Sequence, residues 1–355
     1  MEYINLGNSG LKVPKYILGT IPFGGTNGFE GTGGVQAEQA KKLVDMCLDA
    51  GINMFDTANL YSHGDAEKVL GEAIKGRRDE VLLTSKTGFD LGDNPNSVGA
   101  SRINIERSID ETLERLGTDY IDLYFVHLWD GRTPIKETVR TMTDLVKSGK
   151  IRYWGVSNYS GWSLARTFTI AEQKGYIPPI CQQIYYTPEA REAEYELLPA
   201  GEELGIGSMI WSPLGEGLLT GKISREKNAP EGTRQGNDWK EPWIMDDERL
   251  YQVIDALQEV ADNHNASVPQ IALAWVRERP NVGPVVIAAR NEEQLRENID
   301  SFEIELTKEE DAKIEAIARP EAIYPFWHRA MNGMSQSSPS EKTYLEGYKK
   351  SMGID

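Results

Sequence analysis

The sequence predicts a (β/α)8 barrel, in which eight parallel strands, each followed by a helical segment, close into a ring. Three observations predict this fold. Eight short apolar runs recur along the 355 residues, and segments with helical spacing separate them. Polar residues suited to chemistry stand at the ends of several runs, where barrel active sites gather. Glycines stand where C-terminal helix caps belong, at Gly51, Gly117, Gly149, Gly175 and Gly205.

A β-hairpin is expected before the barrel, because residues 3–13 alternate weakly and carry the turn sequence Gly7-Asn8-Ser9-Gly10. The expected strands are 16–20, 53–57, 81–86, 121–127, 151–157, 181–185, 207–212 and 284–289. The expected helices are 36–50, 65–76, 101–116, 134–148, 162–175, 194–204, 247–264, 267–278 and 292–300.

The rest of the chain is expected to decorate a single domain that spans residues 1–355, with a barrel core of about 14–300. A long loop rich in Gly, Pro and charge, 213–246, follows the seventh strand, and loops of this length are usually functional or disordered. In the extension 301–355, Thr307 and Glu310 form a capping-box pattern that predicts an extra helix over 307–318. Residues 319–355 are expected to begin irregularly, and Ser335 to Ser340 to be mobile.

Composition excludes several classes of protein. The formal net charge of −17 argues against broad binding of nucleic acid or of anionic membranes. No apolar stretch approaches the length of a membrane span, and the N-terminus has no signal-peptide pattern, so a cytoplasmic protein is expected. Two cysteines and four scattered histidines give no metal-ligand spacing. The expected partner is therefore a small molecule.

Four polar residues far apart in sequence are expected to meet at one mouth of the barrel. Asp56, Lys86 and His127 end the second, third and fourth strand runs, and Tyr61 follows the second run closely. A tyrosine beside a lysine is a proton donor whose pKa can be tuned, because a nearby cation favours the phenolate. The sequence therefore predicts a catalytic group in which Asp56 holds Lys86, Lys86 lowers the pKa of Tyr61, and His127 faces them.

Several motifs extend this pattern. The stretch Gly51-Ile52-Asn53-Met54-Phe55-Asp56-Thr57-Ala58 leading to Tyr61 is followed by Gly155-Val156-Ser157-Asn158, by Trp211 to Lys222 and by Ala289-Arg290 with Gln294 and Asn298. In this order the motifs resemble those of aldo-keto reductases, over roughly residues 3–318. The resemblance implies that Tyr61 protonates a carbonyl oxygen while a reduced nicotinamide gives hydride, and that His127 orients that oxygen.

The resemblance also implies the residues that hold the cofactor. Ser157, Asn158 and Gln183 would bind the nicotinamide carboxamide, with Trp211 stacked on the ring, and the loop from Ser212 to Lys222 would face the pyrophosphate. Arg290 follows the eighth strand beside a helix that Asn291 can cap, which suits an adenosine 2′-phosphate and favours NADPH over NADH. The full expected set is Thr20, Ser157, Asn158, Gln183, Trp211, Ser212, Leu214, Gly217, Lys222, Ala289, Arg290, Gln294 and Asn298.

Aromatic residues in or beside the loops are expected to form the substrate pocket. Phe23, Trp129 and Trp327 are the chosen candidates, because apolar pockets with a few polar groups are the usual form of small-molecule sites. Their abundance favours a ring-containing or otherwise hydrophobic carbonyl compound as the substrate.

Three functional interpretations remain open. The favoured one is NADPH-dependent reduction of an aldehyde or ketone. The second is a redox-sensing regulatory or binding subunit on the same fold, because potassium-channel β subunits also resemble this chain, including Trp211-Ser212-Pro213-Leu214. The third is an alcohol or sugar dehydrogenase that runs in the oxidative direction.

Overall fold

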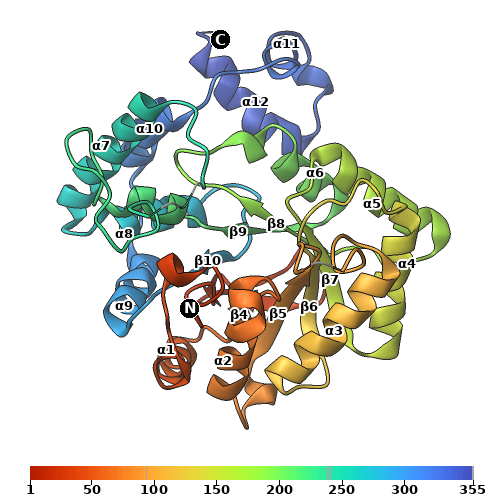
Figure 1. The fold of residues 1–355 in the computed structure, drawn as a ribbon. Helices are drawn as coiled ribbons and strands as arrows, with labels where there is room; N and C mark the ends of the chain where they lie inside the picture. Colours follow the sequence, from red (N-terminus) through yellow and green to blue (C-terminus); the bar gives the residue numbers. More distant parts are fainter. Residues whose placement is uncertain (93, 238, 240, 354–355) are drawn as a thin grey trace.

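The computed structural model describes residues 1–92, 94–237, 239 and 241–353 and confirms the predicted barrel. Eight parallel strands close in the order β10-β3-β4-β5-β6-β7-β8-β9, with helices around them (Figure 1). The strands are β3 (Tyr16–Gly19), β4 (Met54–Asp56), β5 (Leu82–Thr87), β6 (Ile121–Val126), β7 (Ile151–Ser157), β8 (Cys181–Tyr185), β9 (Gly207–Trp211) and β10 (Val285–Ile287).

The predicted helices are all present in the outer layer, with ends that differ by a few residues from those expected. Within the described residues no helix combines the length and the apolarity needed to cross a bilayer. The helices are α1 (Ala37–Asp49), α2 (Asp65–Ala73), α3 (Arg102–Leu116), α4 (Ile135–Ser148), α5 (Gly161–Lys174), α6 (Leu197–Leu204), α7 (Asp247–His264), α8 (Val268–Arg277), α9 (Glu292–Asp300), α10 (Lys308–Ala318), α11 (Phe326–Asn332) and α12 (Pro339–Ser351).

The predicted hairpin is confirmed as the antiparallel pair β1 (Tyr3–Asn5) and β2 (Lys12–Pro14). Leu6 and Val13 from this hairpin are fully buried against barrel-interior residues such as Met54 and Phe125. Gly7 has a φ of 56°, and an added Cβ would lie 2.5 Å from the carbonyl oxygen of Gly205, so only glycine permits this close approach. The hairpin therefore closes the end of the barrel opposite the strand ends that carry the polar residues.

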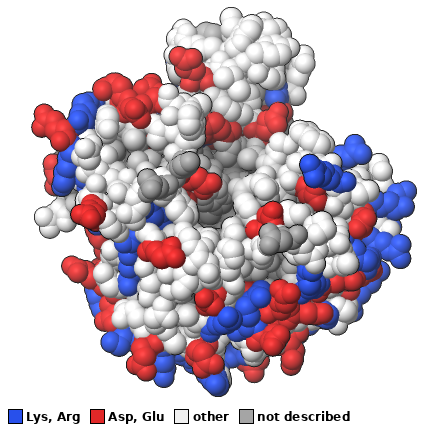
Figure 2. Space-filling model, in the orientation of Figure 1, with Lys and Arg blue, Asp and Glu red and all other residues white. Residues whose placement is uncertain are grey.

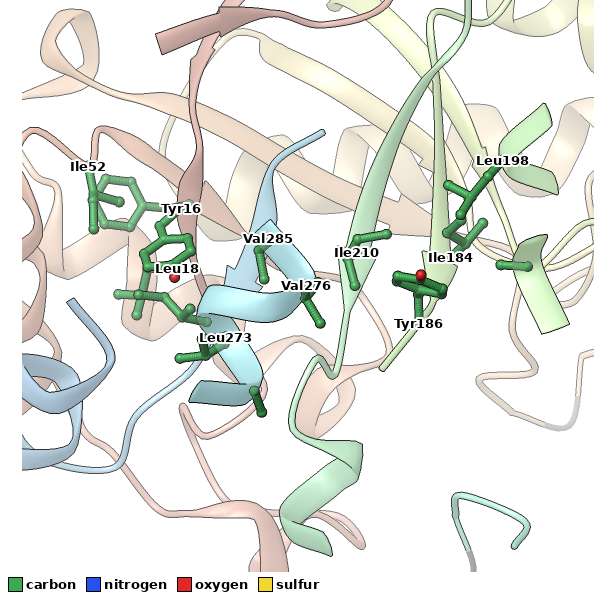
Figure 3. Packing of buried hydrophobic residues seen from close by; sticks show 14 of the residues in the cluster. Tyr16, Leu18, Ile52, Ile184, Tyr186, Leu198, Ile210, Leu273, Val276 and Val285 are labelled. Atoms are coloured by element: carbon green, nitrogen blue, oxygen red, sulfur yellow. The ribbon is translucent and has the colours of Figure 1, made fainter. Parts of the chain in front are cut away.

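The main core lies between the strands and the helices. Figure 3 shows Leu273 and Val276 of α8 beside Val285 of β10, and Tyr186 and Ile184 beside Leu198 of α6. Each of these side chains is almost completely buried, and burial of one such side chain contributes about 1.5–3 kcal/mol. This packing holds the strand ends in place, so the side chains at those ends are held in place as well.

The expectation for the C-terminal residues is confirmed in part. Residues 319–325 are irregular, as expected, but they lead into α11, and the stretch from Ser335 to Ser340, which was expected to be mobile, contains the end of the 3₁₀ turn η7 (Met334–Gln336) and the start of α12. Ser338 and Glu341 form a capping box at the start of α12, and Tyr344 and Tyr348 on that helix are buried. The serine-rich sequence therefore caps a helix, because a serine side chain satisfies an amide at the first turn.

These last two helices form a C-terminal lobe, residues 320–353, at the top of the view in Figure 1. Phe326 of this lobe contacts Tyr195 at 5.1 Å between ring centroids, and the Tyr195 hydroxyl donates to the carbonyl oxygen of Glu321 at 2.6 Å. Tyr195 belongs to the connection between β8 and α6. The lobe therefore braces a segment that also reaches the mouth of the barrel.

Candidate active site

The predicted catalytic residues come together at the carboxyl ends of neighbouring strands. Lys86 Nζ donates to Asp56 Oδ2 at 2.6 Å, to the carbonyl oxygen of Thr57 at 2.9 Å and to the Tyr61 hydroxyl at 3.3 Å. The Tyr61 and His127 rings lie 6.0 Å apart in an edge-to-face arrangement. Each of the three N–H donors of Lys86 therefore has one of these oxygen atoms as its acceptor.

The lysine and the aspartate form a buried ion pair, with side-chain exposures of 0% and 3%. Asp56 Oδ1 also accepts hydrogen bonds from the Thr84 hydroxyl and, at 3.0 Å, from Gln183 Nε2. Burial lowers the pKa of Lys86, but the attraction of Asp56 and then of Tyr61 outweighs it, so the pKa is raised. Lys86 is therefore a fixed positive charge behind the Tyr61 hydroxyl.

A strained turn aims Tyr61 at the cavity. Tyr61 begins the 3₁₀ turn η2 (Tyr61–Gly64), in which Ser62 and His63 have φ values of 49° and 50°. Holding such angles costs of order 1–3 kcal/mol for a residue other than glycine. The Ser62 hydroxyl donates to the carbonyl oxygen of Phe23 at 3.1 Å and accepts from the amide of Gly25 at 3.0 Å. These bonds hold the turn against the β3–α1 connection.

The expected fall in the pKa of Tyr61 is not found. Desolvation by burial is the largest influence and raises the pKa above 10, while the charge of Lys86 lowers it only in part. Asp56 adds a smaller upward influence because its own negative charge disfavours a phenolate. Tyr61 is accordingly a protonated acid throughout the neutral range, with Lys86 limiting the rise.

His127 is neutral. Burial, and after it the nearby charge of Lys86, holds the pKa of His127 well below 6.5. Its Nδ1 atom is buried and has no hydrogen-bond partner among the described residues. We assign the proton to Nε2, because a buried N–H without a partner costs more than a buried acceptor without one. The imidazole can then donate one hydrogen bond toward the cavity.

A cavity of about 1040 Å³ opens above these groups and is visible as the central hollow in Figure 2. Thr20 is absent from its wall, because it is fully buried and its hydroxyl donates to the carbonyl oxygen of Asp56 at 3.0 Å. The other residues expected to hold the cofactor line the cavity: Ser157, Asn158, Gln183, Trp211, Ser212, Leu214, Gly217, Lys222, Ala289, Arg290, Gln294 and Asn298.

At one end of the cavity an amide and an indole are held in place by hydrogen bonds. Trp211 Nε1 donates to Asn158 Oδ1 at 3.2 Å, and Asn158 Nδ2 donates to the carbonyl oxygen of His127 at 3.1 Å. The Trp211 ring is covered on one side by Tyr185, at 4.8 Å between centroids. A flat indole face and the carboxamide of Gln183 therefore border the same space.

The other end carries positive charge and loop backbone. Asn291 Oδ1 caps α9 by accepting from the amide of Gln294 at 2.9 Å, as predicted. The Arg290 guanidinium donates to the carbonyl oxygens of Gly31, Thr32 and Gly232, at 2.7, 3.1 and 2.9 Å. Arg290 thus ties the β3–α1 connection to the long loop.

Sequence analysis missed Arg234 and Glu216 of that long loop. Glu216 is buried, accepts from the indole N–H of Trp239, and lies 3.9 Å from Arg234. Trp239 in turn contacts Phe29 at 6.2 Å between ring centroids. The described part of the loop therefore crosses the mouth and meets the β3–α1 connection. The position of Arg234 and Glu216 in a long glycine-rich loop was the signal that could have identified them.

The three chosen substrate residues do not line the cavity. Phe23 is fully buried in the core, Trp129 packs against Tyr159 at 5.1 Å between centroids, and Trp327 lies on α11 against Tyr324. The apolar wall is built instead from loops that directly follow strands. Its members are Ile21, Phe29, Leu60, Phe89, Leu128, Trp239 and Trp243.

Comparisons with known proteins agree with this geometry. A sequence model of the Aldo/keto reductase family matches residues 17–319. A probable voltage-gated potassium channel subunit beta from Oryza sativa subsp. japonica is 34% identical over 330 residues, covering 90% of this chain and 97% of that protein. The versiconal hemiacetal acetate reductase of Aspergillus parasiticus is 34% identical over 346 residues, covering 92% of this chain and 99% of that protein.

A putative voltage-gated potassium channel subunit beta from Schizosaccharomyces pombe is 35% identical over 323 residues, covering 88% of this chain and 92% of that protein. The matched region contains Asp56, Tyr61, Lys86 and His127 and all of the barrel strands except the first residue of β3, whereas the N-terminal hairpin and the C-terminal lobe lie outside the family match. The chain belongs to the aldo/keto reductase family and is an oxidoreductase that acts on carbonyl or alcohol groups.

Proposed function

We propose that the chain reduces an aldehyde or ketone with NADPH and that Tyr61 is the proton donor. The observation that carries this proposal is the 3.3 Å contact between Lys86 Nζ and the Tyr61 hydroxyl at the floor of the cavity. A buried, permanently charged lysine behind a phenol stabilises the negative charge that the phenol acquires on giving up its proton.

The residues present fit a nicotinamide dinucleotide. Gln183 Oε1 is an acceptor for a carboxamide N–H, Trp211 offers a flat face, and Lys222, Arg234 and Arg290 supply positive charge for phosphates. An added Cβ on Gly217, which has a φ of 108°, would meet no atom closer than 4.0 Å, so its backbone is open to the cavity. The bound cofactor would supply the hydride.

The residues of the chain would divide the remaining work. Nε2–H of neutral His127 donates to the carbonyl oxygen and orients it, which polarises the carbonyl bond. The Tyr61 hydroxyl then delivers its proton to that oxygen, Lys86 stabilises the resulting phenolate, and Asp56 holds Lys86 in place. The long loop and Phe29 shield the site from water, which strengthens each of these electrostatic interactions.

A panel of aldehydes and ketones tests the reaction class. Consumption of NADPH is followed by absorbance for each compound, with NADH in parallel reactions, and the alcohol product is identified by chromatography. Turnover with formation of the matching alcohol is expected. A protein that binds NADPH and reduces no carbonyl compound contradicts the proposal.

The pH dependence should differ between the two directions. Because burial raises the pKa of Tyr61 above 10, the acid form needed for reduction persists from about pH 6 to 9, and kcat/KM for reduction should stay nearly flat. Alcohol oxidation needs the phenolate, whose fraction rises about tenfold per pH unit below the pKa. Profiles in both directions measure this. An oxidation rate that levels off below pH 9 would show that the pKa of Tyr61 is not raised.

NADPH should bind about ten- to a thousand-fold more tightly than NADH, since charge-assisted hydrogen bonds contribute roughly 1.5–3 kcal/mol each. Arg290→Ala should remove most of this difference. Because Arg290 also bonds to Gly232 of the long loop, Trp239→Phe is the matched control, which loosens the loop without changing charge. Titration calorimetry measures both cofactors. An equal loss for NADPH and NADH in Arg290→Ala would mean that the arginine serves only the loop.

A redox-sensing subunit remains a second candidate, favoured by the names of two relatives that match most of the chain. In this role the protein would bind the cofactor and report its redox state to a partner. The carbonyl panel separates the two candidates, because a sensor would bind NADPH with little turnover. The intact contacts of Lys86 with Asp56 and Tyr61 favour the enzyme.

A further inference from the structure

The cavity has a strongly unequal balance of charge. Figure 2 shows acidic atoms on several sides of the central hollow. Among the described residues that line it, carboxylates outnumber cations by six to three. The carboxylates are Asp56, Glu189, Glu192, Glu216, Glu241 and Glu297, and the cations are Lys222, Arg234 and Arg290.

The three cations are the groups assigned above to the phosphates of the cofactor. Once a phosphorylated dinucleotide is bound, its own negative charges neutralise them. Asp56 is neutralised by Lys86, and His127 is uncharged. The charge that a substrate then meets is that of the remaining carboxylates.

Two of these carboxylates belong to the connection between β8 and α6. Glu189 is buried and pairs with Arg249 at 3.2 Å, while Glu192 is exposed at the rim in η4 (Glu192–Glu194) and has no ion pair among the described residues. Between them and Trp211 lies Tyr185, whose buried hydroxyl has no hydrogen-bond partner among the described residues. The segment therefore forms a wall that presents the charge of Glu192 and the Tyr185 hydroxyl, neither of which has a side-chain partner among the described residues.

The pKa of Glu189 in this wall is raised mainly by burial and, to a smaller extent, by neighbouring negative charge. Desolvation by burial is the main cause that raises the pKa of Glu189 to about 7, against the pull of Arg249. Glu192 and Asp246 raise it further by repulsion. A cation placed beside this wall would relieve that repulsion, and an anion would add to it.

The opposite wall, near the reacting groups, is apolar. Phe89 contacts His127 at 4.7 Å between ring centroids, and Phe29 contacts Tyr61 at 6.3 Å. Leu60 and Leu128 line the cavity from the connections that carry those two catalytic residues. A substrate therefore places an apolar group next to its carbonyl carbon and meets the charge of Glu192 toward the β8–α6 side.

We propose that Glu192 selects substrates by charge, so that the enzyme takes carbonyl compounds that are apolar near the carbonyl and uncharged or cationic at the far end. Carbonyl compounds with a carboxylate or phosphate at that end are rejected. The inference rests on the proposed carbonyl reduction, because it assigns the substrate class of the same site.

Two pairs of aldehydes of matched shape test the selection. 4-Formylbenzoate and 4-nitrobenzaldehyde differ mainly in charge, as do (4-formylphenyl)trimethylammonium and 4-tert-butylbenzaldehyde. For each pair the measured quantity is the ratio of kcat/KM of the charged to the neutral compound with NADPH. Comparing this ratio between protein variants cancels the different intrinsic reactivities of the compounds.

Glu192→Gln should raise the ratio for 4-formylbenzoate and lower the ratio for the trimethylammonium compound, each by about three- to tenfold, the size expected for one unit charge within several ångströms in a wet site. Glu192→Lys should extend both changes in the same directions. High salt should shrink the differences, because exposed charges are screened. The Glu192 side chain makes no hydrogen bond to the other described residues, so folding should survive these changes.

Glu196→Gln is the matched control. Glu196 lies four residues further along the same connection, is also exposed and does not line the cavity, so its loss should leave both ratios unchanged. Ratios that do not move in Glu192→Lys, while the neutral aldehydes are reduced, would overturn the charge selection alone. Failure to reduce any neutral aldehyde would overturn the proposed function and this inference with it.

Discussion

Tyr61→Phe is expected to reduce the rate of hydride transfer by about a hundred- to ten-thousand-fold, the usual contribution of a general acid. The variant removes the hydroxyl that lies 3.3 Å from Lys86 Nζ and keeps the ring that packs against His127. Cofactor affinity should change little, because the residues assigned to the cofactor lie on other strand ends. Single-turnover absorbance and calorimetric titration measure the two quantities separately.

Tyr176→Phe provides the comparison for loss of a phenol hydroxyl elsewhere. Tyr176 follows α5 and does not line the cavity, so this variant should match the wild-type protein in both measurements. A Tyr61→Phe protein that keeps most of its single-turnover rate would remove Tyr61 from the role of proton donor. Parallel loss of cofactor binding would instead indicate a collapsed site.

The barrel could be predicted because its signals are local and repeat. Each strand is a short apolar run, and glycine caps such as Gly117 and Gly149 adopt the left-handed angles that end the helices. The closure of the ring follows from the count and from the parallel order, so no long-range contact had to be guessed. The helix that begins at the capping box of Thr307 and Glu310 could be predicted for the same reason, because this signal is also local.

The start of α12 carries the same capping-box pattern, although no helix was predicted there. Ser338 and Glu341 have the spacing of Thr307 and Glu310, but they follow a serine-rich stretch that favours disorder when composition alone is weighed. What stabilises α12 is the burial of Tyr344 and Tyr348 against distant parts of the chain, and that burial cannot be inferred from local sequence.

The meeting of Asp56, Lys86 and His127 could be predicted from position, and the residues of the apolar cavity wall could not. Asp56, Lys86 and His127 are fixed by strand ends, whose place in a barrel is known before any loop is built. Phe23 and Trp327 were chosen as aromatic residues in loops, yet the direction of a loop side chain depends on the turns around it. Phe23 points into the core because the neighbouring glycines, Gly24 and Gly25, turn the chain with φ values of 82° and 68°.

The buried ion pair makes the second large prediction. Lys86→Met should abolish most turnover and also destabilise the protein by about 3–5 kcal/mol, the usual cost of leaving one member of a buried pair without its partner. The carboxylate of Asp56, whose side chain is only 3% exposed, would keep the hydrogen bond from Gln183 but lose the one cation that pairs with it among the described residues. Urea unfolding and single-turnover rates measure the two effects.

The double variant Asp56→Asn with Lys86→Met separates stability from catalysis. Replacing the carboxylate by a neutral amide removes the uncompensated charge, so the free energy of unfolding should return most of the way toward the wild-type value. The turnover rate should stay low, because Tyr61 still lacks the cation that limits the rise in its pKa and stabilises its phenolate. If both properties recover together, Lys86 serves the fold and the catalytic role assigned to it is wrong. If stability recovers alone, the barrel is stable without the ion pair, and the role of the pair lies in catalysis.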